Sequence, residues 1–155
     1  MEADTVHVGR KDGSELYIYT LIDVHSRWVH AEPVMRIGAA GGAKFVRQAQ
    51  LAAPFTFKTV QTDHGPEFSK FFTKKMLEDK IEHRHTRVRK PNDNAHIERF
   101  NRTIQEECIL RLPHNLKVWN TEIPDYLHYY NTDRPHMGLN WLTPVEKLQL
   151  VVPRS

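Results

Sequence analysis

One glutamate, Glu98, lies in a stretch whose polar side chains could hold a charged substrate or a metal ion. Pro91 and three Asn or Asp residues stop the preceding segment and offer N-caps, so a helix should begin near residues 92–94. At about 100° per residue, five polar side chains then share one flank of this helix. They are Asn94, Glu98, Asn101, Arg102 and Gln105.

The ordinary alternative is a solvated helix face with an ion pair between Glu98 and Arg102. Considered alone, the stretch favours this alternative, because exposed charges are common and rarely functional. Beside the polar flank, apolar residues recur at helical spacing and predict a buried stripe of Ile97, Phe100, Ile104 and Cys108. Cys108 is the one cysteine, so it cannot form an internal disulfide, and core packing is its expected role.

A second carboxylate, Asp63, follows a short predicted strand at residues 57–62. Ligand sites in sheet-containing folds gather at strand ends, where side chains are free of the sheet. Gly65 is expected to permit a sharp turn after Asp63, and Phe68 to attach that turn to the core. The alternative role for Asp63 is to cap the turn as an Asx residue.

The composition is that of one globular domain. The chain has 155 residues, of which 39% are hydrophobic and 26% charged. No apolar run approaches the length of a membrane span, and the first residues are not those of a signal peptide. Because its one cysteine cannot form an internal disulfide, we expect an intracellular protein. The net charge of +3 is only mildly basic. Basic residues do crowd residues 83–90, although such a run is usually a solvated surface.

Periodicity predicts a mixed sheet with helices on its faces. Strands are expected at residues 3–8, 16–22 and 28–34, joined by a turn at 11–14 and a tight connection at 23–27. Further strands are expected at 57–62 and 81–86, and helices at 37–53, 68–80, 118–131 and 143–148. Three hairpin strands followed by alternating helices and strands place the chain in the α/β class.

Four motifs follow one another along the chain. They are Tyr17–Asp23 with Ser26 and Arg27, Thr62–Phe68, Asn94–Asn101, and Tyr130–His136 with Leu139 and Thr143–Glu146. Between Asp63 and Glu98 lie 34 residues. The combination resembles the DDE catalytic core of retroviral integrases and bacterial insertion-sequence transposases. The resemblance covers essentially the whole chain and is closest to the insertion-sequence branch.

The resemblance implies a ribonuclease H-like fold, with a five-stranded mixed sheet, three antiparallel strands first, flanked by helices. It also implies three catalytic, metal-binding carboxylates, and two positions compete to be the first. Asp4 matches the strand-one motif of the family and precedes Asp63 by 59 residues. Asp23 ends the second strand, where the family often has a carboxylate that is not a metal ligand. We take Asp4, Asp63 and Glu98 as the catalytic set and Asp23 as a nearby supporting group.

The implied cofactor is a pair of Mg²⁺ or Mn²⁺ ions in each active site. Hard divalent cations prefer oxygen ligands. Two of them about 3.5–4 Å apart can activate a water or a 3′-hydroxyl and stabilise the leaving oxygen. In this arrangement Asp4 bridges both ions, while Asp63 and Glu98 each bind one. Without metal, the clustered carboxylates should repel one another and leave the site loosely arranged.

The resemblance also implies DNA contacts and supporting residues. The residues expected to face DNA are Arg87, Arg89, Lys90, Arg102 and Gln105, for which solvated surface is the alternative. His64 and Asn94, with Asp23, are expected beside the metal ligands. His64 stands where relatives commonly have asparagine. Tyr126, Tyr130, Arg134 and Pro135 are expected to pack and cap the C-terminal helices.

The expected function is a metal-dependent DNA strand-transfer enzyme. It cleaves phosphodiesters at mobile-element ends and joins the freed 3′-hydroxyl to target DNA. Residues 1–155 are expected to form a single catalytic core, without an N-terminal DNA-end-recognition domain. The expected partners are DNA and further copies of the chain in a homodimer or higher oligomer, with no membrane. The expected location is the cytoplasm, on the nucleoid when DNA is bound.

Two alternatives remain from the sequence. The first is a non-catalytic, integrase-like remnant that binds DNA or dimerises without cutting. The second is a ribonuclease that acts on RNA–DNA hybrids, which shares the fold but would ordinarily need a fourth carboxylate.

Overall fold

A five-stranded sheet forms the centre of the protein, whose computed structural model describes residues 1–151. The strands are β1 (Glu2–Gly9), β2 (Glu15–Ile22), β3 (Val29–Val34), β4 (Thr59–Thr62) and β5 (Glu82–His85). Their spatial order is β3-β2-β1-β4-β5. The first three pair antiparallel, whereas β4 pairs parallel to β1 and to β5. The expected mixed sheet is therefore confirmed.

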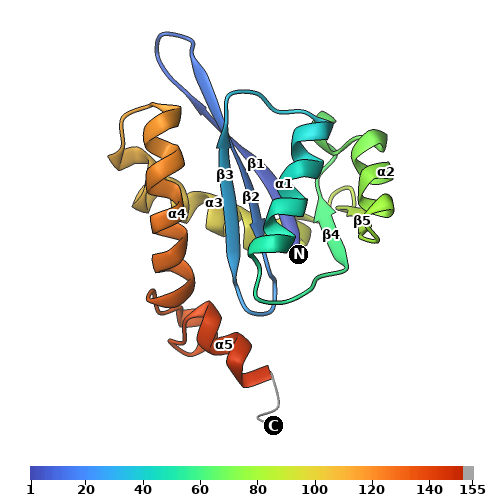
Figure 1. Cartoon of the computed structure of the whole chain (residues 1–155), viewed down its shortest axis with the longest axis vertical. Helices are drawn as coiled ribbons and strands as arrows, with labels where there is room; N and C mark the ends of the chain where they lie inside the picture. The colour runs from blue at the N-terminus through green and yellow to red at the C-terminus, as the bar shows by residue number, and fades with distance from the viewer. Residues whose placement is uncertain (152–155) are drawn as a thin grey trace.

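Helices cover both faces of the sheet (Figure 1). They are α1 (Ala39–Ala52), α2 (Lys70–Glu78), α3 (Ala95–Glu107), α4 (Leu116–Thr132) and α5 (Pro144–Val151). Four 3₁₀ turns join them: η1 (Pro66–Phe68), η2 (Pro91–Asn94), η3 (Ile109–Arg111) and η4 (Met137–Leu139). One apolar cluster packs α1 and α2 against the sheet, and a second packs α3 and α4 against the other face.

The alternation of side chains along β1 decides which residue faces which helix layer. Ala3 belongs to the cluster under α1 and α2, whereas Val6 belongs to the cluster under α3 and α4. Because successive side chains of a strand point to opposite faces, Asp4 shares the α3 side with Val6. In the register of the sheet, Asp4 is paired with Thr20 of β2.

The predicted apolar stripe of α3 is confirmed, but its predicted capping is wrong. Ile97, Phe100, Ile104 and Cys108 are all buried. No Asx side chain caps the helix, because η2 precedes it and the Asp93 carboxylate bonds Arg87 instead. The cap comes from β1, where the buried Glu2 carboxylate accepts a hydrogen bond from the Ile97 amide at 2.8 Å.

The C-terminal helices were predicted closely. The α4 helix extends over the predicted range and includes Pro124. At the start of α5, the Glu146 carboxylate accepts from the Thr143 amide, and the Thr143 hydroxyl accepts from the Glu146 amide. This reciprocal arrangement is a capping box. Within residues 1–151, no helix is long and apolar enough to cross a membrane.

Candidate active site

Asp4 is held by a buried relay of polar side chains from two neighbouring elements. The Asn101 amide nitrogen of α3 donates to Asp4 Oδ2 at 2.8 Å, and the Thr20 hydroxyl of β2 donates to Asn101 Oδ1 at 2.7 Å. Because Thr20 donates to the amide oxygen, the amide nitrogen must point at Asp4. Thr20 is fully buried and Asn101 nearly so, which fixes the direction of the Asp4 carboxylate.

The surroundings of Asp4 disfavour its negative charge. The pKa of its carboxyl is raised from 3.8 to about 6, mainly by burial and also by the nearby charges of Asp63 and Glu67, while hydrogen bonds from the Thr5 backbone and Asn101 act against the rise. A carboxyl held with a raised pKa beside two other carboxylates is a common feature of functional sites. A cation bound nearby would stabilise the charged form of the Asp4 carboxyl.

Asp63 follows β4 at the level of Asp4. Glu2 and Gln61 are paired in the parallel ladder between β1 and β4, and two residues further along each strand stand Asp4 and Asp63. Asp63 is exposed, and its Oδ1 accepts from the Gly65 amide at 2.8 Å. Asp63 is therefore an Asx cap of its turn and also a neighbour of Asp4.

Gly65 permits the turn after Asp63 through the space that it leaves, and not through an unusual backbone conformation. Its backbone has φ −59° and ψ 151°, an extended conformation that any residue can adopt. The backbone conformation alone therefore does not require a glycine. There is no room for a side chain at this position, because a methyl carbon at Gly65 would lie 2.8 Å from Glu67 Oε2 and 3.0 Å from Asp63 Oδ1.

Glu67 is a carboxylate that sequence reasoning left without a role. It lies in η1, directly after the Asp63 turn, and only 6% of the residue is exposed. Its place in the motif between Pro66 and Phe68 was visible in the sequence, but nothing local showed that its side chain turns toward Asp63. In the structure, Glu67 Oε2 and Asp63 Oδ1 both lie within 3.0 Å of the point where a methyl carbon on Gly65 would stand.

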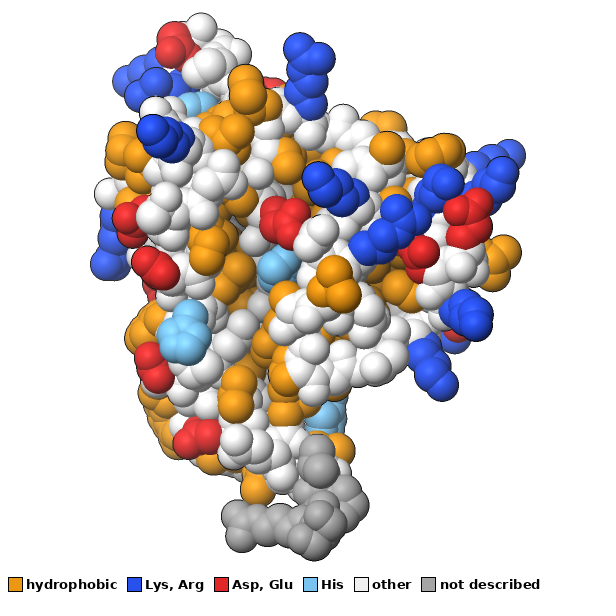
Figure 2. Space-filling model, viewed as in Figure 1, with side chains coloured by type: hydrophobic (Ala, Val, Ile, Leu, Met, Phe, Trp, Pro, Cys, Tyr) orange, Lys and Arg blue, Asp and Glu red, His pale blue; other side chains and the backbone are white. Residues whose placement is uncertain are grey.

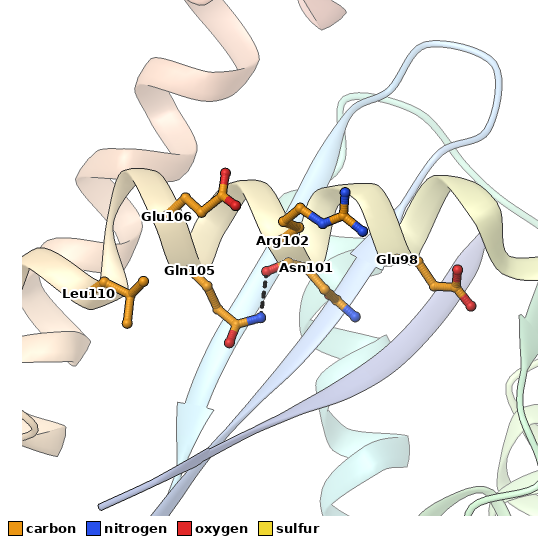
Figure 3. Close-up of a pocket in the computed structure, with 6 residues that line it drawn as sticks. All are labelled: Glu98, Asn101, Arg102, Gln105, Glu106 and Leu110. Carbon is orange, nitrogen blue, oxygen red and sulfur yellow. Dashed lines mark hydrogen bonds between the residues drawn. The ribbon is translucent and has the colours of Figure 1, made fainter.

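Glu98 lies at one end of a pocket on the outer flank of α3 (Figure 3). The pocket is lined by Glu98, Asn101, Arg102, Gln105, Glu106 and Leu110. Gln105 donates to the Asn101 carbonyl oxygen at 2.9 Å. In the described part of the chain, no ion pair joins Glu98 to Arg102, so both charged groups face the pocket without neutralising each other at close range.

The predicted metal ligands are brought to one end of the sheet but do not form a closed cage. Asp4 and Asp63 stand at adjacent strand positions, and Glu98 is one helical turn before Asn101, which touches Asp4. Among residues 1–151, no three Asp, Glu, His or Cys side chains are close enough together, as they stand, to hold a metal ion.

Three residues predicted beside the metal ligands have other neighbours. The Asp23 carboxylate accepts from the Ser26 amide and hydroxyl, so it stabilises the turn between β2 and β3. The His64 ring stacks on His85 with centroids 4.6 Å apart, and its Nε2 is 3.0 Å from the Thr86 carbonyl oxygen. Asn94 Oδ1 is buried and has no hydrogen-bond partner among the described residues.

The predicted DNA-facing residues differ in how free their charges are. Asp93 binds Arg87 through two side-chain hydrogen bonds, of 2.9 and 3.0 Å. Arg89 and Lys90 are exposed on the same loop, where Arg89 adopts φ 61°. Figure 2 also shows many Lys and Arg side chains on the side of the molecule where Figure 1 places α1 and α2. Exposed positive charge is therefore not confined to the loop before α3.

The C-terminal motif fixes helices to the sheet, as expected. Asn131 donates to the Val29 carbonyl oxygen and accepts from the Val29 amide, both at 2.9 Å, so its amide replaces a neighbouring strand at the edge of β3. Arg134 donates to both carboxylate oxygens of Glu107, which also accepts from Tyr126. These contacts hold the end of α3 against α4.

Two family models, both described as "Integrase core domain", match the chain over residues 1–91 and 79–144. A transposase for insertion sequence element IS904 from Lactococcus lactis is 30% identical over 149 residues, which cover 91% of this chain and 57% of the transposase. A putative integrase of Spiroplasma virus SpV1-C74 is 32% identical over 150 residues, which cover 83% and 40%. The chain spans 32% to 57% of the length of the four curated relatives described by these comparisons.

Solved structures of low sequence identity share the fold. The integrase catalytic core of HTLV-2 in complex with magnesium, in its trimeric form, is 18% identical, with a TM-score of 0.72 over 94% of this chain and 92% of that one. The catalytic core of BIV integrase is 20% identical, with a TM-score of 0.68 over 96% and 93%. The fold is therefore ribonuclease H-like, as expected.

Proposed function

Since the chain belongs to the integrase core domain family, we propose that it is the catalytic core of a metal-dependent DNA strand-transfer enzyme. This transposase or integrase cuts phosphodiesters at the ends of a mobile element and joins the freed 3′-hydroxyl to target DNA. The observation that carries the proposal is the meeting of Asp4 and Asp63 at one level of the sheet, under a helix that bears Glu98.

The donor set fits hard divalent cations, Mg²⁺ or Mn²⁺, two in each active site. Carboxylate oxygens are the ligands that such ions prefer. Burial, and to a lesser degree the charges of Asp63 and Glu67, raise the pKa of Asp4, so a cation at this place would favour its charged form. Asp4, Asp63 and Glu98 would hold the ions. When bound, the ions would lower the pKa of an attacking water or hydroxyl and stabilise the leaving oxygen.

The other residues of the site hold and orient these carboxylates. Asn101 and Thr20 aim Asp4. Glu2 caps α3 and so fixes the helix turn that carries Glu98 relative to β1. Asp23 keeps the turn between β2 and β3 closed. His64 follows Asp63 in the chain and Asn94 precedes α3, but neither side chain bonds a proposed metal ligand within the described residues.

DNA is the proposed substrate, and phosphate groups would meet the pocket of α3 and the loop before it. Arg102 and Gln105 line that pocket, and Arg89 and Lys90 are exposed on the loop. Arg87 would contribute once DNA competes with Asp93 for its guanidinium. We propose a homodimer or higher homo-oligomer as the working assembly. In this proposal residues 1–155 form one catalytic core domain.

A nicking assay tests the proposed activity. Purified protein is incubated with supercoiled plasmid in Mn²⁺ or Mg²⁺, and formation of the open circle is measured. Glu98→Gln and Asp63→Asn should each lower the rate by about a hundredfold or more, since each removes a proposed metal ligand. Glu122→Gln, at an exposed position of α4, is the matched control and should nick at the wild-type rate.

The same assay can contradict the proposal. A folded wild-type protein that binds DNA but does not nick it in either metal would favour the alternative of a non-catalytic remnant. Equal nicking by wild type and Glu98→Gln would show that the carboxylate of α3 is not part of the reaction. Preferential cleavage of an RNA–DNA hybrid would favour the ribonuclease alternative.

A further inference from the structure

Arg27 occupies a backbone position that is unfavourable for its residue type. It lies in the turn between β2 and β3 with φ 66°, in the left-handed region that favours glycine. The Arg27 amide donates to the Asp23 carbonyl oxygen, and the Asp23 amide donates to the Trp28 carbonyl oxygen, both at 2.8 Å. Ser26 and Trp28, the chain neighbours of Arg27, are buried. Glycine would meet these backbone requirements without steric cost, so the arginine side chain needs another explanation.

The guanidinium group of Arg27 is not neutralised by a carboxylate. Within residues 1–151, no Asp or Glu lies at ion-pair distance from it. It donates to the Val24 carbonyl oxygen of its own turn. The carboxylate of the turn is engaged elsewhere, because Asp23 accepts from the amide and the hydroxyl of Ser26. Arg27 is half-buried, so its charge can still act on a ligand at the surface.

Two adjacent residues of α4 connect this turn to α3. Asn131 exchanges two hydrogen bonds of 2.9 Å with the backbone of the first residue of β3, which follows the turn. The Tyr130 ring packs edge-on against the Phe100 ring of α3, with centroids 5.1 Å apart. The turn and the middle of α3 therefore lie on two sides of one end of α4.

Arg99 is a second uncompensated arginine at this place. It is exposed, directly precedes Phe100 in α3, and has no carboxylate at ion-pair distance within residues 1–151. The pKa of the Tyr130 hydroxyl is raised to about 12, mainly by burial, while the positive charges of Arg27 and Arg99, among others, act against the rise. Both guanidinium groups therefore contribute to one positive field beside the end of α4.

Arg99 also connects Arg27 to the pocket on α3. Arg102, which lines that pocket, is three residues further along the helix. Residues at this spacing are neighbours on a helix surface, with Cβ atoms about 5–6 Å apart. The three arginines form a basic row that begins at the turn between β2 and β3 and ends in the pocket that Glu98 also lines. Such a row of uncompensated positive charge suits a chain of phosphate groups.

We propose that Arg27 and Arg99 bind phosphate groups of the DNA, whose path continues from the pocket on α3 to the turn between β2 and β3. The proposal rests on the proposed function, since it extends the DNA-binding surface of the same site. A guanidinium group can give two parallel hydrogen bonds to phosphate oxygens. The closed turn holds the backbone of Arg27 in place before DNA binds, which lowers the cost of ordering that side chain.

DNA binding by the whole chain in EDTA tests this surface without any need for metal or cleavage. Fluorescence anisotropy with a labelled duplex gives the dissociation constant at several salt concentrations. Arg27→Gln and Arg99→Gln should each raise it by about fivefold to tenfold at 0.1 M salt and reduce the slope of log affinity against log salt by about one. The double variant should reduce the slope by about two. Arg27→Lys keeps the charge and should keep the slope.

Arg27→Gly separates a role in DNA binding from a role in the fold. Glycine relieves the left-handed backbone, so this variant should melt at or above the wild-type temperature while it loses the same slope as Arg27→Gln. Lys80→Gly is the matched control, because Lys80 is exposed and also left-handed, with φ 59°. Lys80 precedes the start of β5, whereas Asp63 follows the end of the parallel β4, so the two lie at opposite ends of the sheet. Lys80→Gly should leave DNA affinity and slope unchanged.

The outcomes separate this surface from the proposed function. A wild-type slope in both Arg27→Gln and Arg99→Gln, with a reduced slope in Arg102→Ala, would overturn the proposal and leave the proposed function standing. A lower melting temperature of Arg27→Gly together with wild-type DNA affinity would show that the arginine serves only the fold. If the folded wild-type protein binds no duplex at any salt concentration, both the arginine row and the DNA-directed function are wrong.

Discussion

Asn101 of α3 donates a hydrogen bond to Asp4 of β1 over 2.8 Å, and this contact joins the two elements that carry Glu98 and Asp4. The partners are 97 residues apart in the sequence. Asn101 is itself oriented by Thr20, which is paired with Asp4 across β1 and β2. The direction of the Asp4 carboxylate is thus set by two side chains that do not need to touch a substrate.

Replacement of Asn101 by alanine should raise the pKa of Asp4 further above its usual range. The hydrogen bond from Asn101 lowers that pKa, and a single bond of about 1 kcal/mol corresponds to somewhat less than one pKa unit. The titration of the Asp4 carboxyl carbon can be followed by NMR. Thr20→Val, which leaves the Asn101 donor in place, should give a smaller rise. An unchanged titration in Asn101→Ala would contradict the relay.

Asp4→Asn should stabilise the metal-free protein at neutral pH. The folded pKa of about 6 lies above the ordinary 3.8, so protonated Asp4 favours folding below pH 4, and this contribution is lost as the pH rises through 6. Above pH 6 the carboxylate costs at most about 3 kcal/mol. The melting temperature in EDTA at pH 7.5 should therefore rise by several degrees in Asp4→Asn.

The gain from Asp4→Asn should disappear at pH 4, where the wild-type carboxyl is already protonated. Asp125→Asn, at an exposed position of α4, is the control and should change the melting temperature at neither pH. Equal gains at pH 4 and pH 7.5 would show that packing, and not the charge of Asp4, is the cause.

The sequence was sufficient for features that repeat along one element. The apolar stripe of α3 and the alternation of β1 follow from the periods of a helix and a strand, so the burial of Phe100 and the exposure of Glu98 could be predicted. Resemblance to a family added the order of the carboxylates. Neither source contains the distances between Asp4, Asp63 and Glu98.

Contacts between distant elements were beyond sequence reasoning. Asn94 stands where a local N-cap is expected, but Glu2, 95 residues away from Ile97, provides the cap. Gly65 was expected to permit the turn, but the sequence did not show that Glu67 and Asp63 leave no room for a side chain there. The error in the cap has a physical origin, since tertiary partners override local preference wherever a buried polar group must be satisfied.

Glu2→Ala should destabilise the protein and lower its nicking rate by more than the loss of folded protein explains. The Glu2 carboxylate is buried against the first turn of α3, where it accepts a hydrogen bond from the Ile97 amide. Its negative charge also interacts favourably with the positive end of the helix dipole. Loss of such a charged cap costs about 1–3 kcal/mol. Urea unfolding measures this cost. Glu2→Gln retains an acceptor oxygen and should recover part of both stability and rate.

A normal nicking rate in folded Glu2→Ala would show that the position of Glu98 does not depend on the cap. The rate must be compared at equal concentrations of folded protein, which circular dichroism provides. Asn94→Ala is the matched control, because Asn94 stands at the N-cap position but bonds no amide of α3. Asn94→Ala should keep the free energy that the Glu2 cap contributes to folding, as measured by urea unfolding.

Arg102→Ala should weaken DNA binding in a salt-dependent way. Arg102 lines the pocket on α3 and has no carboxylate partner within ion-pair distance in residues 1–151. If it contacts one phosphate, its loss should reduce the slope of log affinity against log salt by about one. Gln105→Ala should weaken binding without changing the slope, since an amide releases no counterion. Fluorescence anisotropy with a labelled duplex at several salt concentrations measures both effects. Arg10→Ala, in the turn between β1 and β2, should change neither affinity nor slope, because Arg10 does not line the pocket. A wild-type slope in Arg102→Ala, with a reduced slope in Arg10→Ala, would place the DNA on that turn and not along α3.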